Sequence, residues 1–277
     1  MTAILSELPL EPIATGLAGR RSPGDGEKVL WLHGYTLDSS SWGELWQLLP
    51  GWRHIGIDLP GHGGSEPMSE QADLRELGQR LGKLCQNEGI RHIVALSFGT
   101  ITALQIALEF PDDFATLTLG GPSLAGGEQD AEVGRAYMRL FQLYHQSTLS
   151  DDAKSKAIRE TWMGCRAWQG VDEHPGLRAA LTQLVDRHSW AELNGYATRQ
   201  FTHPPQQAEA IGRIRASLMV LVGDREMPAF RNSAEKIRNA ATRCDYQELA
   251  DTDHLCMLMS PQPSAALIDA HLRAAAE

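Results

Sequence analysis

The sequence has few cysteines, no excess of basic residues and no long apolar run. None of its four cysteines is in CxxC spacing, which excludes the common zinc and redox motifs, so we predict neither a metal nor a cofactor. We expect the cysteines to be buried thiols in a reducing compartment. The formal net charge is −10, and no cluster of Lys or Arg offsets it. This argues against nucleic acids and anionic membranes as partners.

The most apolar stretch, residues 92–108, contains several polar residues and is too short to cross a bilayer. We interpret it as a buried strand followed by a helix. The first 17 residues contain no Lys or Arg, and the first two arginines come at positions 20 and 21. That order is wrong for a secretory signal. These features predict a cytoplasmic protein without a membrane segment.

Short apolar runs alternate with helical patterns through the first half of the 277 residues. The predicted strands are residues 29–32, 55–59, 92–96 and 115–119. Leucines at helical spacing lead up to Gly89, a capping box at residues 41–44 opens a helix through Leu48, and another helix closes at Pro111. This alternation predicts an α/β fold with a mostly parallel sheet flanked by helices.

The pattern changes after Pro122. From residue 123 to about 212 we find no strand, only helical patterns that carry three tryptophans. Strand patterns return at residues 218–222 and 246–249, and a last helix is expected from 261 to about 275. We therefore predict a core of residues 1–122 and 213–277 and a helical cap of residues 123–212. An unstructured loop of that length would be uncommon.

Residues 93–100 read IVALSFGT, which is close to the nucleophile motif G-x-S-x-G. Ser97 and Gly99 occupy two fixed positions, and Ala95 replaces the first glycine. A serine at such a strand-to-helix turn is held in a strained conformation above the edge of the sheet. The position of Ala95 needs a small residue more than a positive φ, so we expect alanine to be tolerated. On this motif alone, a capping or packing role for Ser97 stays open.

Four further motifs accompany this one along the chain: LWLHGYTLDSSSW, IDLPGHGGS, VLVGDREMP and TDHLCMLMSP. Together the five resemble the α/β-hydrolase superfamily, specifically its capped serine hydrolases with an HG oxyanion loop. The resemblance covers about residues 29–122 and 218–272, and the cap agrees only in position and helical character. It implies the α/β-hydrolase fold and a triad in the chain order Ser, acid, His.

The resemblance assigns the nucleophile to Ser97 and the base to His254. The register of the family's acid places the carboxylate on Glu226, one methylene longer than the usual aspartate. His254 would take the proton of Ser97, and Glu226 would orient the imidazole. Asp224 is expected to have a structural role, and an acid adjoining the histidine cannot easily reach its ring. The rivals for the acid are Asp224, Asp251 and Asp253.

The resemblance also places the oxyanion hole at the backbone N–H groups of Phe98 and Tyr35. His33, in the HG pair, is expected to brace this loop by hydrogen bonds. His62 and Asp58 are expected to be structural residues of the turn in PGHGG.

The predicted activity is hydrolysis of a small, mostly apolar carboxylic ester, or a related lactone or thioester, through an acyl-enzyme. The nearly neutral cap, with nine Lys or Arg and eleven Asp or Glu, fits such a small acyl substrate better than a polyanion. A serine nucleophile counts against epoxide hydrolases and haloalkane dehalogenases, which attack with aspartate. The alternative is a non-hydrolytic protein of the same fold: an acyltransferase, a lyase or a ligand-binding receptor.

Overall fold

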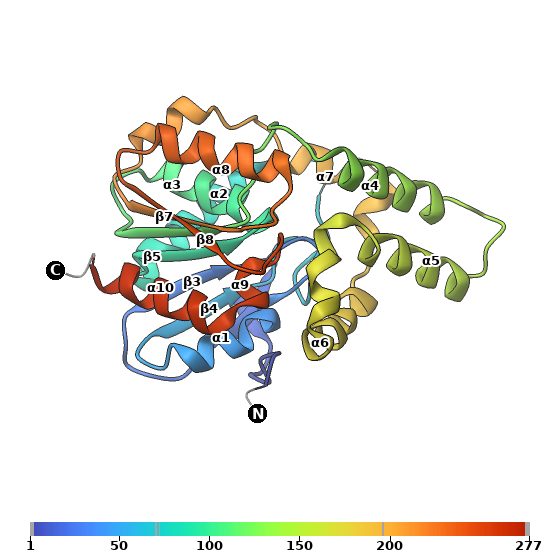
Figure 1. The fold of residues 1–277 in the computed structure, drawn as a ribbon, viewed down its shortest axis with the longest axis horizontal. Coiled ribbons are helices and arrows are strands. Elements are labelled where there is room, and N and C mark those ends of the chain that lie inside the picture. The colour runs from blue at the N-terminus through green and yellow to red at the C-terminus, as the bar shows by residue number, and fades with distance from the viewer. Residues whose placement is uncertain (1–2, 70, 72, 196, 275–277) are drawn as a thin grey trace.

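The computed structural model describes residues 3–69, 71, 73–195 and 197–274. An eight-stranded sheet in the order β1-β2-β4-β3-β5-β6-β7-β8 lies at its centre (Figure 1). Strands β3 to β8 run parallel to one another, and β1 and β2 are antiparallel at one edge. The strands are β1 Glu11–Ala14, β2 Leu17–Arg21, β3 Lys28–Leu32, β4 Arg53–Ile57, β5 His92–Leu96, β6 Thr116–Gly120, β7 Ser217–Gly223 and β8 Cys244–Leu249. The predicted α/β fold, with a mostly parallel sheet flanked by helices, is confirmed.

The central strands are buried on both faces. All five residues of β5 are buried, and their side chains alternate between two hydrophobic clusters. Val94 and Leu96 belong to one cluster, and Ile93 and Ala95 belong to the other. Continuous apolar strands of this kind are typical of parallel sheets covered by helices on both sides.

Helices α2, α3 and α8 cover one face of the sheet, and α1, α9 and α10 cover the other (Figure 1). Helices α4 to α7 come between β6 and β7 and extend beyond the sheet (Figure 1). The helices are α1 Gly43–Leu48, α2 Leu74–Glu88, α3 Phe98–Glu109, α4 Ala131–Tyr144, α5 Asp151–Met163, α6 Pro175–Arg187, α7 Ala197–Phe201, α8 Pro228–Ala240, α9 Cys256–Met259 and α10 Pro261–Ala274. The 3₁₀ helices are η1 Ser39–Trp42, η2 Arg166–Glu173, η3 Ala191–Asn194 and η4 Ala208–Arg213.

The six predicted strands agree with the structure to within two residues at each end. The capping box at residues 41–44 was wrong. Asp38 is the N-cap, because its carboxylate accepts the N–H of Ser40 at 2.8 Å and so starts η1 three residues earlier. The last helix was expected to end near residue 275, which lies outside the described residues. Three cysteines are buried as expected, whereas Cys244, on the edge strand β8, is partly exposed.

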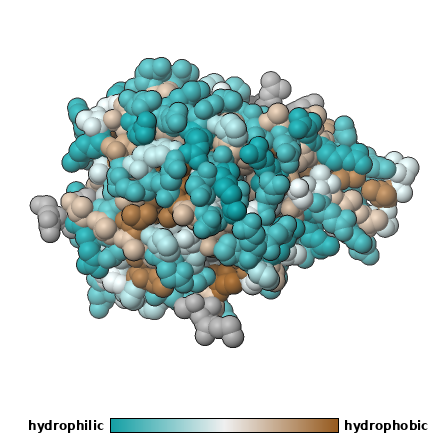
Figure 2. Space-filling model, viewed as in Figure 1, coloured by the Kyte–Doolittle hydropathy of each residue, from teal (hydrophilic) through white to brown (hydrophobic). Residues whose placement is uncertain are grey.

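The surface seen in Figure 2 is mostly hydrophilic, with small separate hydrophobic areas. Of the large hydrophobic side chains described, Leu10 and Met138 are exposed. Every helix in the described part of the chain is too short or too polar to pass through a lipid bilayer.

Candidate active site

Ser97 lies where β5 turns into α3. Its backbone has φ 51° and ψ −117°, a combination that residues other than glycine adopt only under strain. Two hydrogen bonds hold the turn: Ser97 N–H donates to the carbonyl of Gly120 at 2.8 Å, and the Ser97 carbonyl accepts the N–H of Thr100 at 2.8 Å. The side chain is half-buried. The serine is therefore presented on a strained strand-to-helix turn.

The turn leaves little room beside the serine. A Cβ at Gly99 would lie 2.3 Å from the carbonyl oxygen of Leu32 and 2.7 Å from that of His33, so a side chain there would displace the backbone. Ala95 is in a different position, inside β5, where it is fully buried and pairs with Leu32 and Leu119. Its methyl group fits an extended strand. The first position of the motif is thus in extended backbone, without a positive φ, as expected.

His254 lies between Ser97 and Glu226. Its Nε2 is 2.7 Å from Ser97 Oγ, and its Nδ1 is 3.1 Å from each carboxylate oxygen of Glu226. Glu226 Oε1 also accepts the N–H of Met227 at 2.8 Å. A carboxylate at Nδ1 holds the ring proton on that nitrogen, so Nε2 is left to accept a proton from the serine hydroxyl.

The histidine and the glutamate are closely enclosed. His254 is 4% exposed and Glu226 is 5% exposed. The ring of Phe230 packs against the imidazole, with centroids 4.1 Å apart. Gly121 has φ +50°, and a Cβ there would lie 3.1 Å from His254 Nδ1 and 3.2 Å from Glu226 Oε2. A glycine is therefore required beside the pair for both backbone and steric reasons.

Two of the three rival acids, Asp224 and Asp253, make other side-chain contacts. Asp224 accepts the N–H groups of Asp251 and Thr252, each at 3.1 Å. The bond from Asp251 is the main cause of the lowered pKa of Asp224. Asp253 Oδ2 lies 3.2 Å from Nη2 of Arg225. Asp224 therefore holds the loop that precedes the histidine, while Glu226 contacts the imidazole.

Two backbone N–H groups are available beside Ser97. Within the described chain, neither the N–H of Phe98 nor that of Tyr35 has a hydrogen-bond acceptor. The loop that carries Tyr35 lies close to the serine, because a Cβ at Gly34 would be 3.5 Å from Ser97 Cβ. Unpaired N–H groups near a nucleophile are the usual components of an oxyanion hole.

His33 and Asp58 have the bracing roles expected from the sequence. His33 Nε2 accepts the N–H of Leu59 at 2.9 Å, and its Nδ1 lies 2.8 Å from the carbonyl of Gly34. Burial lowers the pKa of His33, which favours the neutral ring that such an arrangement needs. Asp58 Oδ2 accepts the N–H of Gly64 at 2.8 Å.

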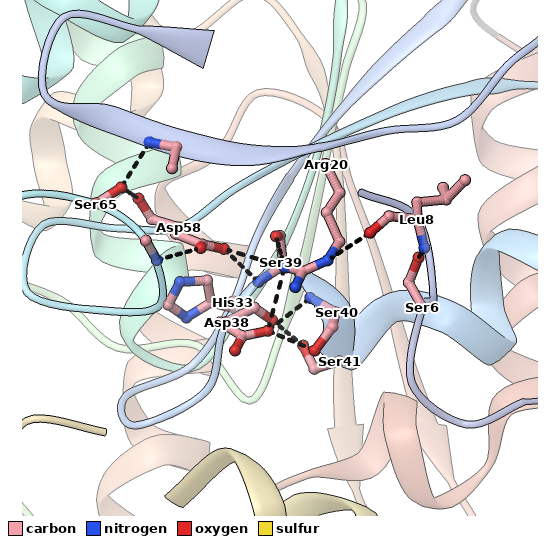
Figure 3. Close-up of polar contacts among 12 residues, drawn as sticks. Ser6, Leu8, Arg20, His33, Asp38, Ser39, Ser40, Ser41, Asp58 and Ser65 are labelled. Carbon is pink, nitrogen blue, oxygen red and sulfur yellow. Dashed lines mark hydrogen bonds and ion pairs between the residues drawn. The ribbon is translucent and has the colours of Figure 1, made fainter. Parts of the chain in front are cut away.

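Asp38, in the loop after the HG pair, is the centre of a charged network (Figure 3). Arg20 Nη1 lies 3.7 Å from Asp38 and 3.9 Å from Asp58. From α6, Arg187 Nη2 donates to Asp38 Oδ2 at 2.7 Å. Burial alone would raise the pKa of Asp38, but hydrogen bonds from Ser40 and the Arg187 guanidinium outweigh it, so the pKa is lowered. The loop is thus tied both to β2 and to α6.

The sequence interpretation missed one group of residues. The Tyr35 hydroxyl donates to Glu192 on η3, and His188 Nε2 lies 3.0 Å from the same oxygen. His62 bonds the carbonyl of Pro60 at 3.0 Å, as a turn residue should, but its ring also packs 4.8 Å from that of His188. The i, i+4 spacing of His188 and Glu192 was the one available signal. Among the described residues, no group of three His, Cys, Asp or Glu side chains is placed to hold a metal ion.

Comparison with curated proteins gives partial likenesses. The chain is 23% identical over 226 residues to the 2-succinyl-6-hydroxy-2,4-cyclohexadiene-1-carboxylate synthase of Yersinia pseudotuberculosis, covering 80% of each chain. It is 32% identical over 265 residues to the probable lysophospholipase BODYGUARD 5 of Arabidopsis thaliana, covering 84% of this chain and 59% of that protein. It spans only 28% of the dihydrolipoyllysine-residue acetyltransferase component of the Cupriavidus necator acetoin cleaving system, at 31% identity over 107 residues.

A solved thermophilic esterase from Thermogutta terrifontis has the same fold, with a TM-score of 0.76, 20% identity and coverage of 99% of this chain and 98% of that one. The sequence profile of the alpha/beta hydrolase family matches residues 29–270, which include β4 to β8 and all but the first residue of β3. The strained serine turn and the sheet order agree with this match. The chain therefore belongs to the alpha/beta hydrolase family.

Proposed function

We propose that this protein is a serine hydrolase that cleaves a small, mostly apolar carboxylic ester, or a related lactone or thioester, through an acyl-enzyme. The observation that carries the proposal is the distance of 2.7 Å between Ser97 Oγ and His254 Nε2 on a strained turn. The buried carboxylate of Glu226 at the other ring nitrogen supports it further. This is the arrangement in which an imidazole activates a serine hydroxyl.

In the proposed reaction, Ser97 Oγ attacks the ester carbonyl carbon while His254 Nε2 takes the hydroxyl proton. The tetrahedral intermediate then collapses, the bond to the leaving alcohol breaks, and His254 returns the proton to that oxygen. Water attacks the acyl-enzyme with the same base, which releases the acid and restores Ser97. The N–H groups of Phe98 and Tyr35 donate to the oxyanion, each contributing about 3 kcal/mol in the transition state.

We assign the triad to a core of residues 1–122 and 213–277 and treat residues 123–212 as a cap over it. The run of helices α4 to α7 between β6 and β7 supports this division. The partner would be a small acyl substrate. The chain has a formal net charge of −10 and its cysteines are free, which fits a cytoplasmic protein that does not bind nucleic acid.

A second candidate is a non-hydrolytic reaction, favoured by the likeness to the Yersinia synthase over 80% of each chain. The name of that enzyme describes a carboxylate product. In this chain a buried glutamate, Glu192, contacts Tyr35 beside the serine turn. A negative side chain there would repel an anionic ligand, so ester hydrolysis is the better-supported reading.

Covalent labelling with a fluorophosphonate tests the proposal directly. Wild-type protein should be labelled, Ser97→Ala should not, and the exposed Ser69→Ala should label like wild type. On any ester that is turned over, Ser97→Ala should lower kcat by about 10⁴- to 10⁶-fold without unfolding the protein. Wild-type protein that resists the probe at every pH would instead favour a binding protein built on this fold.

A further inference from the structure

A second group of buried polar side chains lies where loops of the sheet meet the helical segment, by which we mean the run of helices from α4 to α7 between β6 and β7. We name it the Glu192 cluster; it consists of Tyr35, His62, His188 and Glu192. His62 is 1% exposed, Glu192 3% and His188 7%. Two members come from loops after β3 and β4, and two come from the end of α6 and from η3. The triad chemistry proposed above uses none of these side chains.

The hydrogen bonds of the cluster fix where its protons are. Burial and the nearby Glu192 carboxylate raise the pKa of Tyr35 well above its usual range, so the phenol keeps its proton and donates it to Glu192 Oε1. Burial would raise the pKa of Glu192, but hydrogen bonds from His188 and Tyr35 lower it, so this side chain is a carboxylate. Burial and the neighbouring His188 hold the pKa of His62 well below its usual value, so that ring is neutral.

Two acceptor atoms of the cluster are left over. His62 Nδ1 lies 3.0 Å from the carbonyl of Pro60, which can only accept, so the single proton of the neutral ring is on Nδ1. His62 Nε2 is therefore a lone pair. Within the described chain, neither this nitrogen nor Glu192 Oε2 has a hydrogen-bond partner, and both are buried. Buried polar atoms of folded proteins are nearly always paired, so two acceptors in one cluster point to a ligand with hydrogen-bond donors.

The cluster lies next to the proposed nucleophile. The ring of Phe98, which follows Ser97, is 5.9 Å from that of Tyr35 and 6.0 Å from that of His62. The backbone N–H of Tyr35 is one of the two proposed oxyanion donors. A substrate whose carbonyl oxygen is bound by the N–H of Tyr35 would therefore place its neighbouring groups beside this cluster.

We propose that the Glu192 cluster is a specificity subsite that binds a hydrogen-bond donor on the substrate, close to the ester; this rests on the proposed hydrolase function. An alkylammonium group carries three N–H donors, enough for both acceptors, whereas a hydroxyl carries one, enough for one of them. A carboxylate presents only acceptors and is excluded. The structure therefore predicts the order of preference ammonium, hydroxyl, methyl, carboxylate at this position of the substrate.

The test compares kcat/KM of the full-length protein on esters of one skeleton. The acyl-side set is methyl butanoate, methyl 3-hydroxypropanoate, methyl 3-aminopropanoate and monomethyl succinate, which carry methyl, hydroxyl, ammonium or carboxylate at the same position; the alcohol-side pair is propyl and 2-hydroxyethyl butanoate. In at least one set, the donor-bearing ester should exceed its plain partner at least tenfold. Glu192→Gln places an N–H where the carboxylate had a lone pair, so the ratio of amino to plain ester should fall at least tenfold.

Two further variants make the result specific. His62→Phe keeps a ring but removes one acceptor, so the amino ester should lose its advantage over the hydroxy ester. Glu160→Gln, the same change at a glutamate whose side chain is 60% exposed on α5, should keep the wild-type ratios. Thermal melting and fluorophosphonate labelling report whether each variant is folded and its triad intact.

The outcomes separate the two proposals. Two results would overturn the subsite and leave only a bridging water to account for the two acceptors. In one, wild-type protein is labelled and hydrolyses plain esters but shows no preference for donor-bearing esters; in the other, Glu192→Gln keeps that preference. If wild-type protein is neither labelled nor active on any ester, the hydrolase proposal itself fails, and the subsite falls with it.

Discussion

At the scale of single residues, the acid of the candidate triad differs from the family's usual aspartate, and this difference can be read from the sequence. Glutamate stands at the acid position, and both of its carboxylate oxygens are 3.1 Å from His254 Nδ1. The aspartate two residues earlier is engaged with the backbone of Asp251 and Thr252. The nearest aspartate in the sequence is thus a structural residue.

Glu226→Gln should lower kcat by about 10³- to 10⁴-fold, because an amide can donate to Nδ1 and favour the wrong tautomer of His254. Asp224→Asn is the matched control. It should leave kcat within about threefold of wild type, because that carboxylate faces backbone N–H groups on the surface. Steady-state kinetics on one ester measure both. A larger loss in Asp224→Asn than in Glu226→Gln would reassign the acid.

At the scale of elements, the HG loop is held from two directions. Arg20 on β2 and Arg187 on α6 both approach Asp38, whose side chain is 5% exposed. The Arg187 side chain is 48% exposed, so solvent screens its part of the interaction. The buried carboxylate therefore matters more than the cation from the helical segment.

Asp38→Ala should destabilise the protein by about 3 kcal/mol, since it leaves the Ser40 N–H without its acceptor and leaves Arg20 with Asp58 as its remaining buried carboxylate. Arg187→Met should cost less than about 1 kcal/mol. Urea unfolding at pH 7 measures both, and equal losses would contradict this ranking. The folded pKa of Asp38 is lowered, so its stabilisation is present above the unfolded value of about 3.9 and is lost as pH falls through the lower folded value.

Strands that are buried on both faces could be predicted from the sequence more readily than partly exposed strands. Strands β3 to β7 are almost wholly buried and could be read as short apolar runs. The hairpin of β1 and β2 escaped prediction because polar, partly exposed residues such as Arg20 and Arg21 interrupt its apolar pattern. The start of η1 was misplaced because Asp38, outside the apparent capping box, captures the first free N–H.

The candidate site was predictable only where a residue sits inside a motif. Ser97, Glu226 and His254 each follow a recognisable strand, and parallel strands bring their carboxyl ends to one edge. His62 and Glu192 are brought into one cluster, through His188 and Tyr35, only by tertiary packing, and no local sequence pattern links them. The cluster could therefore be found only in three dimensions.

At the scale of the whole molecule, buried neutral histidines set the response to acid. Burial lowers the pKa of five of them: His33, His54, His62, His92 and His271. That of His54 falls from 6.5 to about 4. Between these values the unfolded chain binds protons that the folded chain does not, so stability falls as pH falls.

His54 alone should remove up to about 3 kcal/mol of stability between pH 7 and pH 4. Its ring accepts from Trp31 Nε1 at 3.1 Å and lies 3.1 Å from the carbonyl of Leu49. His54→Gln should therefore be less stable than wild type at pH 7.5 but lose less on acidification. Urea midpoints at pH 7.5, 6 and 5 measure this. A wild-type midpoint that does not change over this range would refute it.

Tyr35 joins two parts of the molecule in one residue. Its hydroxyl is bound to Glu192 on η3, while its backbone N–H has no acceptor within the described chain and is one of the two proposed oxyanion donors. If that amide stabilises the oxyanion, any outward swing of η3 pulls on the same residue and spoils its alignment. Without substrate, a protein whose η3 had moved outward would then be inactive. Substrate binding that brings η3 back would at the same time align the Tyr35 amide and make Ser97 reactive.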